Sequence, residues 1–349
     1  MNHQVHVGTR DDPHAQARSA RTLPVLLHSM AVFRELFEII FDSREIRTVV
    51  EVGVESGKVS GMYAELGATA VYCVDPKPTD EIRANLAEND ALHLVEGWSP
   101  DVLADLPVAD MYVLDGDHNY AIVHDELAWV MANAPDAVIV LHDVMWPCAR
   151  RDLYYEPSAL GPERRHPASA DGPTVWHDEL TPAGFVGLGA FTSAERAGGE
   201  RNGVLTAVED AVAESPWPDG WRFELVPAVF GMGILVRTTP EADRLLERLR
   251  PFTESRLLCI LENNRIALYT KVLQMQFEAV AHADDADRLA ETVARQRHEL
   301  AAAATRQANQ VLALQLEVDR LRGLLGRRFR PRLAGALRRL ARLLRRLGL

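Results

Sequence analysis

The sequence predicts an α/β fold in which helices cover both faces of a mainly parallel sheet, with a helical extension after it. Short apolar segments recur between residues 48 and 142, separated by glycine turns and amphipathic stretches. This pattern is typical of repeated βαβ units. Past Pro240 glycine becomes rare and helix-forming residues dominate. We therefore expect a globular domain over residues 26–240 and a helical, coiled-coil region over residues 241–325.

The two ends of the chain differ from these parts. Residues 1–25 are polar and lack the apolar core of a signal peptide, so we expect them to be disordered. A helix over Leu26–Phe41 should cover one face of the sheet. Two strands, Arg222–Val226 and Gly231–Val236, should close the domain as an antiparallel pair. Residues 326–349 predict a basic amphipathic helix.

The first strand–turn–helix–strand unit, Thr48–Asp75, indicates a nucleoside site of the Rossmann-like kind. Gly53 lets the chain turn sharply off the first strand, and Gly57 lets the following helix pack closely. Asp75 ends the second strand, where ribose hydroxyls need a hydrogen-bond acceptor. The alternative is an ordinary strand-to-helix connection without a ligand.

The residue between the two glycines narrows the choice of nucleoside. Glu55 occupies the position at which a dinucleotide loop has its middle glycine. A carboxylate there would repel phosphate, whereas S-adenosylmethionine carries no phosphate and has a positive sulfonium. The E-x-G-x-x-x-G spacing resembles motif I of class I methyltransferases. This resemblance implies that Glu51, Gly53, Gly57 and Asp75 contact S-adenosylmethionine.

Polar residues follow the third and fourth predicted strands. Ala91–Glu96 runs into Gly97-Trp98-Ser99, and Ala109–Leu114 runs into Asp115. Ligands bind outside the carboxyl ends of the strands in open α/β sheets. The resemblance implies that Trp98 and Ser99 flank the adenine and that Asp115 also contacts the cofactor. The alternative is a buried aromatic side chain and a helix N-cap before Pro100.

The ends of the fourth and fifth strands carry the most specific pattern. The fourth ends in Asp115-Gly116-Asp117-His118, and the fifth, starting at Val138, ends in His142-Asp143. Adjacent strands lie roughly 5 Å apart, so Asp115 and Asp143 should face each other. Two carboxylates at that distance must share a proton or a cation.

The D-G-D-H pattern resembles that of methyltransferases acting on sugar hydroxyls, a group with metal-dependent members. The resemblance implies that Asp115 and Asp143 hold a divalent ion such as Mg²⁺ and that His118 is the general base. Asp117 then contacts the metal or holds His118. Relatives that bind metal often have two neighbouring acidic or amide residues after the fifth strand, so metal dependence stays open here. We interpret His142 as an imidazole packed at the sheet edge.

A sugar hydroxyl is a poor nucleophile, and its proton must leave as the methyl group arrives. A positioned histidine contributes roughly 10² to 10⁴ in rate as a base. We therefore expect an S-adenosylmethionine-dependent O-methyltransferase acting on a saccharide or saccharide-containing metabolite. The alternative is a non-catalytic, membrane-recruited assembly or regulatory protein with a methyltransferase-like body. The intact glycines, Asp75 and His118 favour the enzyme.

A long segment, residues 146–203, interrupts the regular pattern after the fifth strand. Loops of this length are usually lids or binding loops when they contain residues that favour burial. We expect an acceptor-binding lid in which Arg150, Arg151 and Tyr154 offer hydrogen bonds and stacking faces. The alternative is that these arginines form salt bridges that tie the loop to the acidic body.

A heptad pattern marks the helical region. Two series recur every seven residues, offset by four: Val293, Leu300, Gln307, Leu314 and Leu321, and Ala304, Val311, Val318 and Leu325. This is a coiled-coil seam, which predicts a homodimer or a helical partner. A single solvated helix and a hairpin with Glu254–Phe277 are the alternatives.

The last segment, residues 327–349, holds nine arginines and no acidic residue, in a chain of net charge −12. Leucines recur there at spacings of three and four, opposite the arginines. Such a helix suits an anionic membrane surface. Nucleic acid is disfavoured because the leucine face would stay uncovered, and packing on the protein's own acidic surface is a third reading. Cys73, Cys148 and Cys259 are scattered, which predicts a location in the reducing cytoplasm. Together with the basic helix, this predicts a cytoplasmic enzyme that can be peripheral at the inner membrane face.

Overall fold

The computed structural model describes residues 11, 12, 14–22, 30–54, 56–328 and 334–346. Its contacts divide the chain into two compact units, Met1–Phe277 and Glu278–Leu349. The first unit contains the α/β domain, and the second is helical.

The first unit is built on a seven-stranded sheet with the order β3-β2-β1-β4-β5-β10-β9. β1 to β5 are parallel, and β10 is antiparallel to both β5 and β9. The predicted Rossmann-like sheet with a closing antiparallel pair is therefore confirmed. The strands are β1 (Thr48–Val52), β2 (Ala70–Asp75), β3 (Leu92–Glu96), β4 (Met111–Leu114), β5 (Val138–His142), β9 (Trp221–Val226) and β10 (Met232–Arg237).

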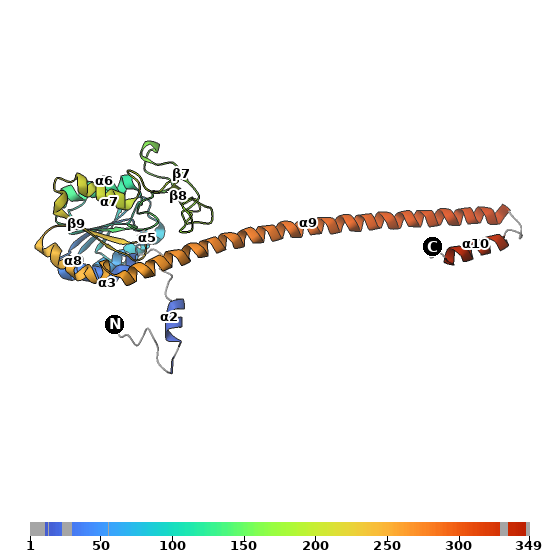
Figure 1. The fold of residues 1–349 in the computed structure, drawn as a ribbon, viewed down its shortest axis with the longest axis horizontal. Coiled ribbons are helices and arrows are strands. Elements are labelled where there is room, and N and C mark those ends of the chain that lie inside the picture. The colour runs from blue at the N-terminus through green and yellow to red at the C-terminus, as the bar shows by residue number, and fades with distance from the viewer. Residues whose placement is uncertain (1–10, 13, 23–29, 55, 329–333, 347–349) are drawn as a thin grey trace. The chain divides into compact units, whose positions relative to one another are not determined.

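Helices cover both faces of this sheet, as the sequence predicts (Figure 1). Phe37 and Leu245 pack with Val49 of β1 on one face, and Leu127 and Val50 share the core on the other. Strands buried on both sides read as continuous apolar runs, which is why β4 and β5 lack alternation. The helices are α3 (Arg34–Ser43), α4 (Ser60–Glu65), α5 (Asp80–Leu86) and α8 (Pro240–Thr253) on the first face, and α6 (Tyr120–Asn133) and α7 (Val204–Glu214) on the second.

The start of α6 fixes the residues that follow β4. Asn119 caps this helix, because its side-chain oxygen accepts a hydrogen bond from the Ile122 backbone amide at 3.0 Å. His118 and Asp117 therefore lie in a short turn between the buried strand β4 and the capped helix α6. This turn brings both side chains to the carboxyl edge of the sheet.

The segment between β5 and α7 folds into a small three-stranded antiparallel sheet of order β6-β8-β7. Asp152 joins this segment to the body: one carboxylate oxygen, Oδ1, accepts from the backbone amides of Tyr120 and Gly203, each at 2.7 Å. Predicting only a long lid there misses these strands, because each is very short. They are β6 (Leu153–Tyr155), β7 (Ala168–Ser169) and β8 (Phe191–Ala194).

Two boundaries differ from the sequence prediction. Within the segment predicted to be disordered, residues 15–22 form the helix α2 (Ala15–Thr22), whose alanines and arginines favour helix. The helix predicted over Leu26–Phe41 is a 3₁₀ turn, Met30–Phe33, followed by α3, and residues 23–29 lie outside the described part. α8 packs on α3 and β9, so it belongs to the α/β body.

α9 (Arg256–Arg328) is one continuous helix that starts in the first unit. The alternative of a hairpin with Glu254–Phe277 is therefore wrong, because no turn follows Phe277. α10 (Ala334–Arg346) begins after a segment that lies outside the described residues. The predicted basic helix over residues 326–349 is thus shorter, and Arg327 and Arg328 belong to α9. Among the described helices, none combines the length and apolarity needed to cross a bilayer.

Candidate active site

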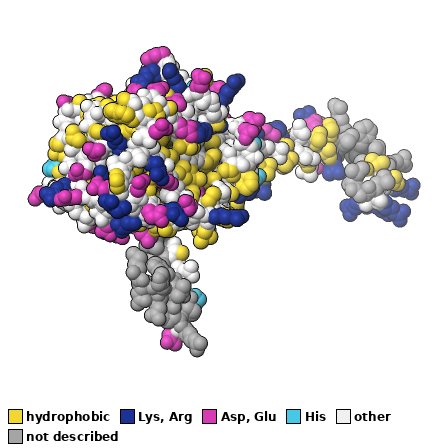
Figure 2. All heavy atoms as spheres, turned by 60° about the vertical axis from the view of Figure 1, so that its left-hand side comes forward, with side chains coloured by type: hydrophobic (Ala, Val, Ile, Leu, Met, Phe, Trp, Pro, Cys, Tyr) yellow, Lys and Arg dark blue, Asp and Glu magenta, His cyan; other side chains and the backbone are white. Residues whose placement is uncertain are grey.

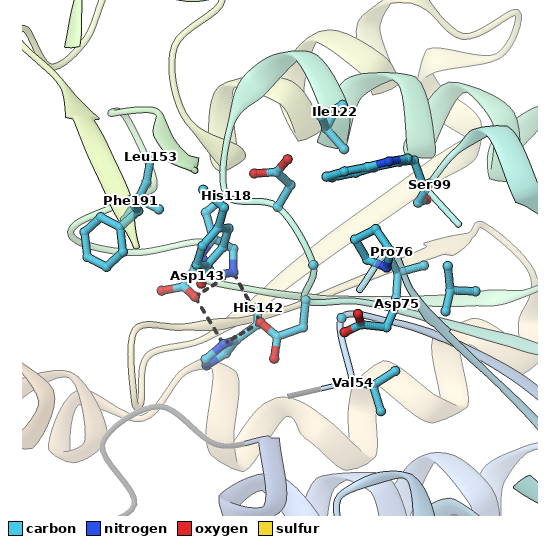
Figure 3. Close-up of a pocket in the computed structure, with 18 of the residues that line it drawn as sticks. Val54, Asp75, Pro76, Ser99, His118, Ile122, His142, Asp143, Leu153 and Phe191 are labelled. Atoms are coloured by element: carbon cyan, nitrogen blue, oxygen red, sulfur yellow. Dashed lines mark hydrogen bonds and ion pairs between the residues drawn. The ribbon is translucent and has the colours of Figure 1, made fainter. Parts of the chain in front are cut away.

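A cavity of about 510 Å³ opens at the carboxyl ends of the parallel strands. This volume is in the range of small-molecule sites, roughly 300–1,000 Å³. Figure 3 shows its two ends: Asp75, Ser99 and Ile122 lie at one, and His118, His142 and Asp143 lie at the other. Leu153 and Phe191 lie beyond the histidines.

The turn after β1 forms the floor between these ends. Gly53 has φ +87°, and a Cβ atom there would lie only 2.3 Å from the Asp115 carbonyl oxygen. Its backbone amide donates to the Val74 carbonyl at 3.0 Å. Glycine is therefore required both by conformation and by the close approach of the turn after β4.

The other motif residues either line the cavity or support it. Asp75 lines it and accepts a hydrogen bond from the Lys77 amide at 2.7 Å. Glu51 and Gly57 are not among the lining residues; Glu51 instead accepts from the Ser60 hydroxyl, beneath the turn. Gly57 has φ +75° and packs where α5 approaches. Glu55 lies outside the described residues.

Three buried polar atoms of the lining residues have no hydrogen-bond partner within the described part of the chain: Ser99 Oγ, Asp117 Oδ1 and Glu126 Oε1. Burial raises the pKa of Asp117 to about 6 and the pKa of Glu126 to about 8. Buried polar groups without partners indicate a ligand with its own donors and acceptors. Sequence reasoning missed Glu126, although an acid four residues after Ile122 on an apolar helix face was a signal.

The other end holds a compact cluster. Ligand-type atoms of Asp115, His142 and Asp143 all lie within 4.8 Å of one another. His142 Nδ1 is 3.0 Å from Asp115 Oδ1 and 3.3 Å from Asp143 Oδ2. His118 Nε2 is 3.2 Å from Asp143 Oδ2 and 3.4 Å from Asp115 Oδ1. The structure therefore brings the two predicted aspartates together, with both imidazoles.

The charges in this cluster perturb one another strongly. Burial lowers the pKa of His118, but Asp143 and Asp115 outweigh it and raise the value to about 9. The same carboxylates raise the pKa of His142 well above its ordinary value. The two imidazoles in turn hold the pKa values of Asp115 and Asp143 below the usual range, against burial. Perturbations of this kind cluster at functional sites.

The hydrogen bonds of His142 indicate whether the cluster of Asp115, His142 and Asp143 suits a cation. Its Nε2 donates to the Val229 carbonyl at 2.9 Å, so in the neutral ring Nδ1 carries a lone pair. That lone pair would face two carboxylates, an arrangement that only a proton or a cation stabilises. One imidazole nitrogen and two carboxylate oxygens are a suitable donor set for a divalent metal ion.

Two sequence interpretations change here. His142 does pack, with its ring 5.9 Å from the Phe33 ring, but it also belongs to the cluster, which the interpretation as a packing residue misses. Asp117 is not in the cluster that the described residues form. Of the two roles expected for Asp117, a metal contact or a hold on His118, the grouping of ligand-type atoms does not support the first.

Aromatic and aliphatic side chains wall the cavity beyond His118. The ring of Tyr155 lies 5.7 Å from the His118 ring, and Phe191 lies 6.1 Å from Tyr155. Phe185 and Phe230 pack against each other in the same wall, with ring centres 6.1 Å apart. The insertion after β5 thus contributes an apolar surface to the site.

The residues predicted to bind the acceptor do not line this cavity. Arg150 forms a two-pronged salt bridge with Glu209, with both distances 2.6 Å. Arg151 donates to the carbonyl of Ala194 at 2.5 Å. Tyr154 is buried and donates to Asp152 at 2.8 Å. The salt-bridge alternative therefore describes Arg150, and strand alternation in β6 turns Tyr155, rather than Tyr154, toward the cavity.

A comparison with protein families matches residues 50–144 to the model of a methyltransferase domain. The matched segment runs from β1 to just past β5, and so contains both ends of the cavity. A comparison with curated protein sequences finds no match.

Among solved structures, the chain is similar to a precorrin-6y C5,15-methyltransferase from Geobacter metallireducens, with 22% identity, TM-score 0.30 and coverage of 36% of this chain and 67% of that one. An SAH-bound methyltransferase from Podospora anserina is 14% identical, with TM-score 0.38 and coverage of 64% and 86%. A methyltransferase from Geobacter sulfurreducens is 14% identical, with TM-score 0.35 and the same coverage.

Proposed function

We propose that this chain, a class I S-adenosylmethionine-dependent methyltransferase, methylates a hydroxyl oxygen that binds beside His118 and the cluster of Asp115, His142 and Asp143. The observation that carries this proposal is the meeting of a base and paired carboxylates at the end of the cavity opposite Asp75. A hydroxyl needs this combination, because it must lose a proton while it attacks.

The cofactor would occupy the other end. Gly53, which has no side chain, would let the cofactor approach the turn after β1. Asp75 would accept hydrogen bonds from the ribose, and Trp98 and Ser99 would flank the adenine. Bound S-adenosylmethionine supplies a methyl group on a positive sulfonium. The unpartnered oxygens of Ser99, Asp117 and Glu126 support a ligand with amino and hydroxyl groups there.

His118 would take the hydroxyl proton at Nε2, the ring nitrogen that faces the carboxylates. A base must be neutral before it acts, and a pKa of about 9 leaves the imidazole charged at neutral pH. Asp115, His142 and Asp143 would hold a divalent ion, whose positive charge would offset the carboxylates and lower the pKa of His118. The nitrogen ligand makes Mn²⁺ as suitable as Mg²⁺.

The acceptor end favours a molecule that presents a hydroxyl beside an apolar face. Tyr155, Phe185 and Phe191 offer rings, and Glu156 is a polar lining residue beside them. A saccharide-containing metabolite remains the first proposed acceptor, since the carbon–hydrogen face of a sugar can lie on such rings. A hydroxylated aromatic ring is the second candidate, favoured by the apolar wall.

The test is transfer of a labelled methyl group to a panel of sugars, glycosides and hydroxylated aromatic compounds, with and without EDTA. We expect product with at least one class, loss of transfer with EDTA, and recovery on addition of Mn²⁺ or Mg²⁺. Undiminished transfer in EDTA would remove the ion from the proposal. Binding of S-adenosylhomocysteine without transfer to any acceptor would favour the non-catalytic alternative.

We further propose that the chain dimerises through α9 and that α10 binds an anionic membrane surface. The exposed side chains of Leu300, Leu314 and Leu321 support the seam, since they are separated by multiples of seven residues and nothing covers them in the described structure. Leu340, Leu343 and Leu344 are exposed on α10, and at helical spacing its five arginines fall on the opposite side. Figure 2 shows dark-blue basic side chains gathered near the C-terminal end of the chain.

Replacing Arg338, Arg339, Arg342, Arg345 and Arg346 with glutamine should release the protein from anionic vesicles. Each basic residue contributes about 1 kcal/mol near anionic lipid, so we expect affinity to fall by more than about 100-fold. Co-sedimentation with vesicles of phosphatidylserine and phosphatidylcholine measures this, with pure phosphatidylcholine as the control. Sedimentation velocity should still show a dimer, and unchanged vesicle binding would contradict the membrane proposal.

A further inference from the structure

The turn between β9 and β10 has an unusual backbone conformation. Val229, Phe230 and Gly231 have φ values of 45°, 65° and 92°. Branched and aromatic residues rarely adopt this left-handed region, so two of the three positions are strained. Such strain persists only where contacts from elsewhere hold the backbone.

One carboxylate on α9 supplies those contacts. Glu262 Oε2 accepts from the Val229 amide at 2.9 Å, and Oε1 accepts from the Phe230 amide at 2.8 Å. Arg265 donates to the same carboxylate: its Nε lies 2.7 Å from Oε2, and its Nη2 lies 2.7 Å from Oε1. The Glu262 side chain is only 3% exposed. The carboxylate therefore holds two consecutive amides of the strained turn.

The β9–β10 turn also contacts the candidate active site in two places. The Val229 carbonyl accepts the hydrogen bond from His142 Nε2, which aims Nδ1 at Asp115 and Asp143. The Phe230 ring lines the cavity, and the Arg265 guanidinium lies 4.3 Å from its centre. A change at Glu262 would thus reach both the cluster and the acceptor wall.

We propose that Glu262 is a positioning residue for the reaction: by holding the Val229–Phe230 turn, it fixes His142 in the cluster and Phe230 in the wall. The inference rests on the proposed function. Partners that orient a ligating histidine typically change metal affinity or activity by about 10- to 100-fold when removed. Glu262 acts through such a partner, the Val229 carbonyl, and links α9 to the chemistry.

The first test measures Mn²⁺ binding to the full-length chain by electron paramagnetic resonance. In Glu262→Gln one of the two backbone amides, of Val229 or Phe230, loses its acceptor and faces the glutamine NH₂ group. The turn then no longer holds His142 in place, so we expect Mn²⁺ affinity to fall about tenfold. The KM for the acceptor should rise as Phe230 moves. Affinity for S-adenosylhomocysteine should stay within about twofold, because its end of the cavity is remote from the turn.

The second test is independent of metal and turnover. In the ion-free protein, nuclear magnetic resonance should show a His142 Nε2 proton protected from exchange by the Val229 carbonyl, and Glu262→Gln should remove that protection. Glu299→Gln makes the same change at an exposed position of α9 and is the matched control. If Glu262→Gln fails to fold, Arg265→Lys keeps the carboxylate but loses the two-pronged pair, and should shift both readouts less in the same direction.

Unchanged Mn²⁺ affinity and unchanged His142 protection in folded Glu262→Gln would overturn the inference. Failure of the proposed function has a different signature, since the wild-type chain would then transfer no methyl group. The protection experiment still decides the role of Glu262 in that case.

Discussion

Replacing His118 with alanine should lower kcat by roughly 10² to 10⁴ while the affinity for S-adenosylhomocysteine stays unchanged. The reason is geometric: His118 Nε2 lies beside both carboxylates, at the end of the cavity away from Asp75. Single-turnover transfer of a labelled methyl group measures the chemical step, and calorimetry measures cofactor affinity. His93→Ala, at an exposed position of β3, is the control and should retain full activity.

The pH dependence provides a second readout of the same residue. In the ion-free protein the pKa of His118 is raised to about 9, so the neutral base accumulates only as pH rises toward that value. Residual activity without metal should therefore increase up to about pH 9, and added ion should move this rise to lower pH. Because the folded-state pKa is the higher one, the ion pair stabilises the protein below about pH 6.5 and is lost by about pH 9. A pH profile that is identical in His118→Ala would exclude His118 as the base.

Gly53→Ala should remove cofactor binding and turnover together. A Cβ atom at this position would lie 2.3 Å from the Asp115 carbonyl oxygen and 2.5 Å from Gly116 Cα. Both are backbone atoms of the turn that carries the cluster, so the clash must move either the cofactor floor or Asp115. The left-handed backbone, φ +87°, adds roughly 1–2 kcal/mol for alanine. A shift of about 1 Å costs about 10² in rate, so we expect at least that loss.

Gly61→Ala is the matched control, because nothing lies within 4 Å of a Cβ atom there and the residue is in α4. Alanine in a helix should leave stability equal or slightly higher. S-adenosylhomocysteine affinity and thermal unfolding of the two variants provide the comparison. Wild-type affinity in Gly53→Ala would show that the cofactor does not approach this turn.

The sheet and the glycine turns at its carboxyl edge could be predicted because their signals are local. Gly53 and Gly57 mark turns through a backbone conformation that glycine adopts without strain, and both do have positive φ. Asp75 follows directly from the end of β2. The pairing of Asp115 with Asp143 was also predictable, since adjacent parallel strands end at the same edge.

Contacts between distant segments escaped prediction. Sequence alone indicates a packing role for His142, because its link to Val229 spans 87 residues, and the proposed role of Glu262 depends on a turn 32 residues away. Residue type alone predicts an acceptor contact for Arg150, Arg151 and Tyr154. In the fold, Glu209, backbone carbonyls and Asp152 are their respective hydrogen-bond partners.

Local sequence determined where strands and turns follow one another along the chain, where glycine turns occur and which strands end in acidic residues. Periodicity and backbone preference act over only a few residues. The tertiary structure decided which polar side chains have no partner in the protein and can bind a ligand. A side chain becomes available for chemistry only when no distant partner satisfies it, and those partners are set by three-dimensional packing. The sequence could therefore predict the glycine turns and Asp75 at one end of the cavity, whereas the cluster with His142, the wall with Tyr155 and the contacts of Glu262 required the assembled fold.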